Sequence, residues 1–306
     1  MVESLVNVLK RQTNCLQRKS IAVSGGLKRT KMNIAQKIIE AHKLKFGSLP
    51  PLQQCSVSGS ALFNADCMYI LPLIPDKSVQ LILADLPYGT TANKWDSVLD
   101  LNKLWIEYKR ILSSNGTVLL FSSQPFTTDL IISARDWFKY EIIWDKMHGT
   151  DFQLANIKPM KSHENILVFA PNKTTYNKQM IKRDKVIDTR GWKQDKRNRD
   201  HNNFHSSENI VKVYKDKNPT TVLQYSMANG ECNNSKRIHP TQKPIFIIDW
   251  LLKTYSNEND MILDNTMGVG TTCLGAKELN RKFIGIEKEV KYYELAVGRV
   301  FGQHCH

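Results

Sequence analysis

Several features that mark other protein classes are missing from this chain of 306 residues. It has no stretch of roughly eighteen apolar residues, so no transmembrane helix is expected, and its N-terminus lacks the apolar core of a secretory signal. Its few cysteines never form a Cys-x-x-Cys pair, which argues against a disulfide framework or a zinc site and favours a reducing, intracellular setting. They are Cys15, Cys55, Cys67, Cys232, Cys273 and Cys305.

Acidic residues are scarce: 29 Asp and Glu stand against 43 Lys and Arg, giving a net charge of +14. Two blocks carry the excess. Residues 1–60 contain 10 basic and 2 acidic residues, and residues 145–240 contain 18 and 10, whereas the segments 61–144 and 241–306 are nearly neutral. A neutral core with two basic appendages fits a polyanionic partner. The alternative is charge that serves only solubility.

Outside the basic blocks, short apolar runs alternate with stretches of helical spacing. This alternation predicts an α/β fold with a parallel sheet. Strands are expected at 61–64, 79–84, 117–121, 140–144, 261–263 and 282–286, and helices at 68–73, 99–112, 126–137, 245–255, 272–279 and 291–301. Residues 1–60 predict a basic arm or helical appendage, with a helix over 33–45, and within 146–240 only 165–169 predicts a clear strand.

The stretch Asp85-Leu86-Pro87-Tyr88-Gly89 directly follows the buried strand predicted at 79–84. At the carboxyl end of a parallel strand, such residues point into the crevice where open α/β sheets bind ligands. A carboxylate, the exposed carbonyls of a stiff turn and an aromatic ring together suit a flat polar ring as ligand.

A glycine loop lies between the last two predicted strands. Asp264 opens it, Gly268 and Gly270 lie within it, and Glu287 closes the following strand. An acid at that strand end suits the hydroxyls of a ribose. The loop lacks the Gly-Lys-Ser/Thr of a P-loop, and Asp264 would repel a pyrophosphate. It fits a cationic or zwitterionic ligand, of which S-adenosylmethionine is an example.

Four segments in this order resemble the β group of bacterial and phage amino-DNA methyltransferases, which act on adenine N6 or cytosine N4. They are Asn64–Cys67, Asp85–Tyr88, His239–Pro244 and Asp264–Thr272. The resemblance implies a Rossmann-like, S-adenosylmethionine-dependent methyltransferase fold with circularly permuted motif order. The arm (1–60) lies outside the resemblance, which divides the rest of the chain into a catalytic half (61–145), a basic target-recognition insert (146–238) and a cofactor-binding half (239–306).

The resemblance also implies roles for individual residues. Catalysis would rest on Asp85, Leu86, Pro87 and Tyr88. The family usually has proline at the position of Leu86, whose backbone carbonyl is the working atom, so leucine removes no functional group. Asp66 would meet the cofactor's adenine, Glu287 its ribose, and Asp264, Gly268, Gly270 and Lys243 its methionine end. The remaining expected cofactor contacts are Cys67, Asp85, Asn265 and Thr271.

The expected partner is double-stranded DNA with the target base flipped out of the helix. Arg183, Arg190, Arg197 and Arg199 of the insert are candidates for reading base edges. A homodimer is one possible oligomeric state, and neither a membrane partner nor a metal ion is expected. The expected location is the cytoplasm, or the nucleus in a eukaryotic host.

Three other functions stay open. The glycine pattern disfavours a nicotinamide-dependent dehydrogenase. A cytosine-N4 methyltransferase is a nearer rival, although those enzymes usually carry serine at the position of Asp85. A non-catalytic DNA-binding protein with a methyltransferase fold is supported only by Leu86. The sequence favours transfer to adenine N6.

Overall fold

The computed structural model describes residues 32–46, 59–89, 99–188, 213–226 and 242–302. Contacts divide the chain into two units, Met1–Asn33 and Ile34–His306, and all described secondary structure lies in the second. Of the arm predicted at 1–60, only residues 32–46 and 59–60 are described. Residues 32–46 contain α2 (Ile34–Phe46), which confirms the predicted helix. No described helix has the length and apolarity to cross a membrane.

An eight-stranded sheet organises the second unit, in the order β1-β10-β9-β2-β3-β5-β4-β8. The first five strands in this order run parallel, and β5 is antiparallel to both of its neighbours. The C-terminal strands β9 and β10 thus lie between β1 and β2. The strands are β1 (Ala61–Asn64), β2 (Val79–Ala84), β3 (Leu112–Ser122), β4 (Phe138–Thr150), β5 (Lys161–Phe169), β8 (Val222–Gln224), β9 (Met261–Asp264) and β10 (Lys282–Glu287).

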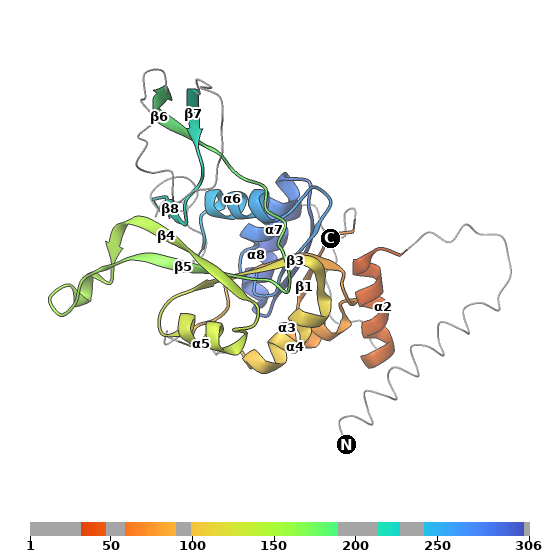
Figure 1. Cartoon of the computed structure of the whole chain (residues 1–306). Helices are drawn as coiled ribbons and strands as arrows, with labels where there is room; N and C mark the ends of the chain where they lie inside the picture. The colour runs from red at the N-terminus through yellow and green to blue at the C-terminus, as the bar shows by residue number, and fades with distance from the viewer. Residues whose placement is uncertain (1–31, 47–58, 90–98, 189–212, 227–241, 303–306) are drawn as a thin grey trace. The chain divides into compact units, whose positions relative to one another are not determined.

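Both faces of the sheet are buried, because helices pack on each side (Figure 1). Alternate residues of β2 show the division: Ile82 and Ala84 belong to one hydrophobic cluster, and Leu81 and Leu83 to the other. Such double burial explains why β2 is a continuous apolar run. The first cluster includes residues of α2, α3 (Cys67–Ile70), η1 (Leu71–Leu73), α4 (Leu101–Ile111) and α5 (Phe126–Ser133). The second includes residues of α6 (Ile245–Tyr255), α7 (Thr271–Glu278) and α8 (Val290–Phe301).

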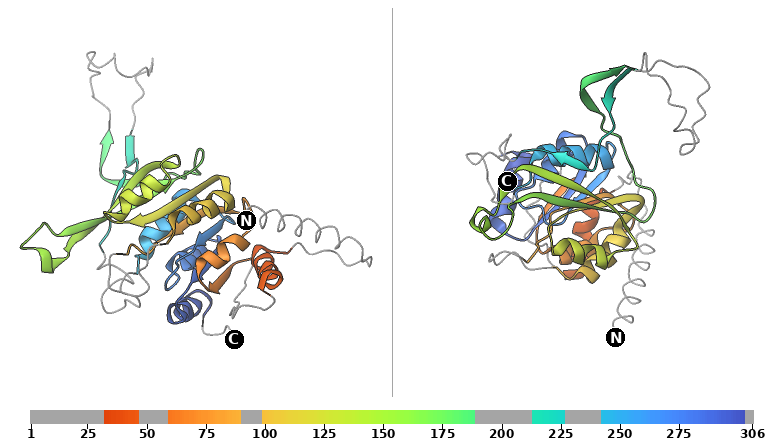
Figure 2. Two further views of the ribbon diagram at one scale, coloured as in Figure 1. Left: turned by 90° about the horizontal axis from the view of Figure 1, so that it is seen from below. Right: turned by 60° about the vertical axis from the view of Figure 1, so that its left-hand side comes forward.

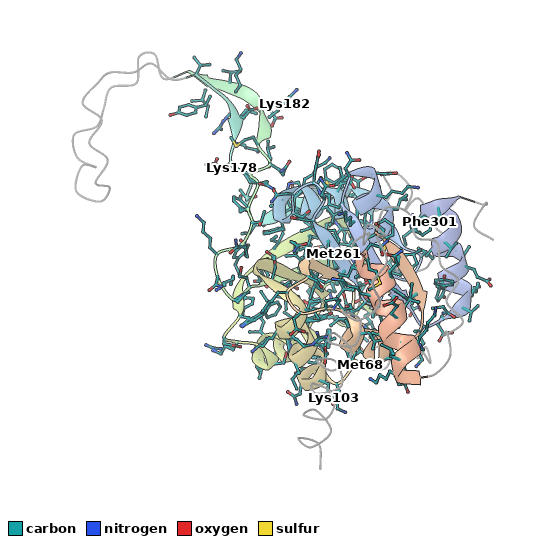
Figure 3. All side chains as sticks on the ribbon, turned by 90° about the vertical axis from the view of Figure 1, so that its right-hand side faces the viewer. Met68, Lys103, Lys178, Lys182, Met261 and Phe301 are labelled. Atoms are coloured by element: carbon teal, nitrogen blue, oxygen red, sulfur yellow. The ribbon has the colours of Figure 1, made fainter. Side chains whose placement is uncertain are left out.

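The insert contributes more strand than its sequence predicts. Beyond 165–169, which is part of β5, it holds the end of β4, the edge strand β8, and a separate ribbon of β6 (Ile181–Asp188) and β7 (Val213–Lys217). The ribbon bears Lys182 and projects from the sheet (Figures 2 and 3). The prediction of a single strand was wrong because these strands are mostly exposed, and backbone pairing rather than apolar burial defines them. The boundary expected at 145/146 falls inside β4.

Candidate active site

The acids expected to form the site follow neighbouring parallel strands. Asn64 of β1 pairs with Glu287 of β10, Gly285 pairs with Asp264 at the end of β9, and Ile82 of β2 pairs with Leu263. Because the carboxyl ends of parallel strands meet at one edge, Asp66, Glu287, Asp264 and Asp85 gather along it. Residues from both halves of the chain therefore form a single site.

Asp85 follows β2, next to β9 in the sheet, and both of its carboxylate oxygens have partners. The Tyr88 hydroxyl donates to Oδ1 at 2.8 Å, and Lys243 Nζ lies 2.8 Å from Oδ2. The Asp85 side chain is 27% exposed, so it borders solvent on one side. Burial raises the pKa of Asp85, and the positive charge of Lys243 opposes that rise.

The turn after Asp85 is fixed by packing. Leu86 is 2% exposed and belongs to the first hydrophobic cluster, so its side chain anchors the turn where the family's proline would stiffen it. Tyr88 stacks on Phe126, with ring centroids 5.3 Å apart and an interplanar angle of 29°. The turn thus presents a carboxylate beside an aromatic pair.

The glycine loop adopts backbone conformations that need glycine. Gly268 has φ 53° and Gly270 has φ 74°, both in the left-handed region. The Gly268 amide donates to Glu287 Oε2 at 2.9 Å, which ties the loop to the end of β10. A Cβ atom on Gly268 would meet nothing within 4 Å, so the loop borders open space there.

One hydrogen bond joins the two predicted sites. Thr266 Oγ1, in the glycine loop, donates to the backbone oxygen of Asp85 at 3.0 Å. Asp264 precedes it by two residues and is 5% exposed. Its carboxylate accepts from the Thr266 amide at 3.2 Å, yet burial raises the pKa of Asp264 to about 7. Burial also raises the pKa of Glu287. A cation or a hydrogen-bond donor placed beside either acid would therefore stabilise its ionised form.

The segment after β1 forms a further wall. Asp66 caps α3 by accepting from the Met68 amide at 2.9 Å. Cys67 is buried, and burial raises the pKa of its thiol to about 11, which disfavours a nucleophilic role. Behind the loop, Tyr108 donates to Asn265 Oδ1 at 2.5 Å, whereas Asn265 Nδ2 is buried and unpartnered within the described part of the chain.

Comparisons with known proteins identify the family and the fold. The family model described as DNA methylase, of the N6/N4 type, matches residues 79–298. The chain belongs to this DNA methylase family. The methylase is 27% identical over 274 residues to "Type II methyltransferase M.HinfI" of Haemophilus influenzae, covering 79% of this chain and 68% of that protein.

Two solved structures share the methylase fold. The M1.HpyAVI–SAM complex matches with a TM-score of 0.54 at 23% identity, covering 78% of this chain and 98% of that one. The cytosine-N4-specific PvuII DNA methyltransferase matches with a TM-score of 0.54 at 15% identity, covering 81% and 89%. The predicted family and fold are confirmed. The fold alone does not separate adenine from cytosine as the target, because a cytosine enzyme matches as well.

S-adenosylmethionine is the cofactor of this family, as predicted, and the site fits it. Asp264 and Glu287 offer carboxylates for an ammonium group and ribose hydroxyls, and Gly268 leaves space for a close approach of ligand to backbone. Asn265 Nδ2 offers a buried donor. Arg299 of α8 braces the loop by donating to the Val269 carbonyl at 2.6 Å and to Thr271 Oγ1 at 3.2 Å. The contacts assigned to individual residues remain predictions.

The structure also brings in residues of the methylase that the sequence did not indicate. Glu164 of β5 contacts Lys243, Lys146 of β4 contacts Glu164, and Phe126 of α5 stacks on Tyr88. No local motif marks these three residues, because each lies on a different element. Thr266 lies within the predicted glycine loop, but its hydrogen bond to Asp85 was not predicted. Among the predicted residues, Lys243 contacts Asp85.

Several sequence predictions concern residues outside the described part of the methylase, namely His239, Arg190, Arg197 and Arg199. Arg183 is described: its Nε donates to the Asp216 carbonyl at 3.0 Å across the β6–β7 ribbon. No group of three His, Cys, Asp or Glu among the described residues could hold a metal ion.

Proposed function

We propose that this methylase transfers a methyl group from S-adenosylmethionine to the exocyclic N6 amine of adenine in double-stranded DNA. The observation that carries the proposal is the place of Asp85. Its carboxylate lies beside the Tyr88–Phe126 ring pair, and its backbone oxygen is hydrogen-bonded to the glycine loop. The acid itself favours adenine over cytosine, because the cytosine-N4 enzymes usually carry serine at this position.

The target base must leave the helix, since its amine is inaccessible inside a duplex. Tyr88 would stack on the flipped ring. The amine is a weak nucleophile because its lone pair is delocalised into the ring. The Asp85 carboxylate and the Leu86 carbonyl would accept its two hydrogens and favour a tetrahedral nitrogen.

Bound S-adenosylmethionine supplies an electrophilic methyl group on a sulfonium. Alignment of the amine with that group is the main contribution of the protein, and no covalent enzyme intermediate is needed. The high pKa of the Cys67 thiol agrees with such a direct transfer.

The basic insert is the proposed contact with DNA. The β6–β7 ribbon exposes Lys182, Lys185, Lys215 and Lys217, and Lys178 lies just before it. Figure 3 labels Lys178 and Lys182. Cations on a protruding ribbon suit phosphates, which position a duplex without reading it. Arginines of the insert would read base edges.

We also propose that the protein can form a homodimer, which light scattering would test.

The decisive experiment incubates the full chain with S-adenosylmethionine labelled in its methyl group and with unmodified DNA, followed by nucleoside analysis. N6-methyladenine is expected. Recovery of N4-methylcytosine alone would reverse the base assignment. If varied DNAs yield no methylated base while the cofactor still binds, the chain is a DNA-binding protein with a methyltransferase fold. Asp85→Ala is the control for background activity.

A second experiment tests the role of the insert. DNA binding should weaken with salt along a log–log slope of roughly −0.9 per neutralised phosphate. Replacing Lys182 and Lys185 by glutamine should reduce the slope without changing sequence preference, whereas replacing Arg183 should change the preference. Equal, sequence-independent weakening from both changes would remove the insert as the recognition element.

A further inference from the structure

Four charged side chains of alternating sign form a row that ends at the catalytic carboxylate. Lys146 Nζ lies 2.6 Å from Glu164 Oε1, Glu164 Oε2 lies 3.1 Å from Lys243 Nζ, and Lys243 Nζ lies 2.8 Å from Asp85 Oδ2. The members come from β4, β5, the segment before α6 and the turn after β2. The row therefore links the antiparallel strands of the sheet to the active site.

The inner part of the row is withdrawn from water. The side chains of Lys146, Glu164 and Lys243 are only 12%, 15% and 11% exposed. Lys243 Nζ also lies 5.0 Å from the centroid of the Phe121 ring, a further contact for its positive charge. Charges so placed interact strongly, and removing one leaves its neighbour without compensation.

Asp85 faces charge of both signs. Glu164 of β5 is the negative group that acts on it, Lys243 is the positive group in direct contact, and Asp264 of β9 is a neighbouring acid that is negative only when ionised. Tyr88 donates to its other oxygen. Lys146 contacts Glu164 on the side away from Asp85. Lys161 of β5 lies close enough to interact electrostatically with both Lys146 and Glu164. Without Lys243, Asp85 would be a partly buried acid between two other acids.

We propose that Glu164 and Lys243 are positioning residues for methyl transfer: Glu164 holds the Lys243 ammonium against Asp85, which keeps the Asp85 carboxylate ionised and oriented to accept the hydrogens of the target amine. The inference rests on the proposed function in one respect, that Asp85 is the acceptor. It gives Lys243 a role toward Asp85 instead of the predicted role at the methionine end of the cofactor.

The protonation states agree with this assignment. Burial alone would raise the pKa of Glu164, but the adjacent Lys243 and Lys146 lower it to about 2, so Glu164 stays negative at neutral pH. Burial would lower the pKa of Lys243, but Asp85 and Glu164 raise it above its usual value, so Lys243 stays positive. An ion pair that persists at neutral pH can hold Asp85 in one orientation.

The test compares Lys243→Met, Glu164→Gln, the double variant and Lys243→Arg in the full-length protein. Single-turnover methyl transfer to DNA is measured from pH 5 to 9 at saturating cofactor. In Lys243→Met, the acidic limb of the rate profile should move up by roughly one to three pH units, the usual effect of one close opposite charge. Lys243→Arg should keep the limb within about half a unit of wild type, because it preserves the charge.

Glu164→Gln provides a matched comparison. It removes a negative charge facing Asp85 and should not raise the limb, while the maximal rate falls because Lys243 loses its second partner. The double variant should show a limb between those of wild type and Lys243→Met, because it removes one charge of each sign. If Lys243→Met does not fold, the double variant is compared with wild type directly, and its limb should still be higher.

A second readout is independent of turnover. In protein labelled with carbon-13 at aspartate carboxyl groups, the Asp85 signal is identified by its loss in Asp85→Asn, and its titration midpoint should rise in Lys243→Met. Wild-type protein that transfers no methyl group would refute the proposed function and leave this titration readable. An unmoved midpoint and rate limb, with the loss confined to cofactor affinity, would overturn the inference and return Lys243 to the cofactor.

Discussion

Cofactor affinity should rise with pH through the ionisation of Asp264. The pKa of this buried acid is about 7, and an ammonium group of the cofactor pairs only with the ionised form. With that pKa the ionised fraction grows roughly 25-fold between pH 5.5 and 7.5, which is about 1.9 kcal/mol of binding free energy at 1.36 kcal/mol per decade. The predicted rise in affinity ends near pH 7.5, because the cofactor's ammonium group is an α-amino group and free α-amino groups lose their proton at about pH 8.

Isothermal titration calorimetry of S-adenosylmethionine into the full chain measures this dependence. At pH 6, titrations in buffers of different ionisation enthalpy should reveal release of about one proton per cofactor bound. Asp264→Asn should bind more weakly and lose most of the pH dependence. A constant affinity across the window, or the same slope in Asp264→Asn, would refute the pairing of the ammonium group with Asp264.

Asp264 also affects the folding stability of the protein without cofactor, and this contribution falls with rising pH instead of increasing. Its pKa is raised from 3.8 to about 7 on folding, so the folded form holds its proton more firmly than the unfolded form. Its contribution to stability is complete below pH 3.8 and is lost as pH rises through 7. Apo wild type should therefore lose melting temperature relative to Asp264→Asn over this range, measured by circular dichroism. Equal curves for the two proteins would contradict this account.

Three further predictions test the division of the site and the packing that supports it. Asp85→Ala should abolish methyl transfer but keep most cofactor affinity. Gly268→Val should mainly destroy cofactor binding, because it places a β-branched residue at φ 53° in the open loop. Equal losses of cofactor binding in the two variants would contradict the division of the site. Gly285→Ala should destabilise by about 1–3 kcal/mol in urea unfolding, since its Cβ would clash with Met267 Sδ and lie 2.6 Å from both Cys273 Sγ and Leu62 Cδ2. Gly298→Ala, with nothing within 4 Å, is its control and should stabilise by about 0.5–1 kcal/mol. Leu86→Ala should cost about 2–5 kcal/mol, because the side chain is 2% exposed, and a neutral result would show that packing does not hold the turn.

The elements that carry the site follow from local pattern. The predicted bounds 79–84 and 245–255 coincide with β2 and α6. A strand buried on both faces must be continuously apolar, and a helix needs a periodic apolar face, so each leaves a signal within a few neighbouring residues. The acids and glycines at strand ends are equally local, so they can be matched to the family's motifs in the amino-acid sequence, and that resemblance implies the permuted motif order and the cofactor.

The partners of those residues were decided only by tertiary structure. Glu164 and Lys146 lie on partly exposed strands, and nothing in the sequence near Lys243 indicates that its charge is shared with them. Likewise, the polar strands of the insert form by pairing with β5 or with each other, so their sequences lack the apolar alternation of a buried sheet. An ion pair between distant segments depends on sheet order and register, and these arise from the packing of the whole chain. The sequence thus determined which groups are available for methyl transfer, and the fold determined which of them touch Asp85.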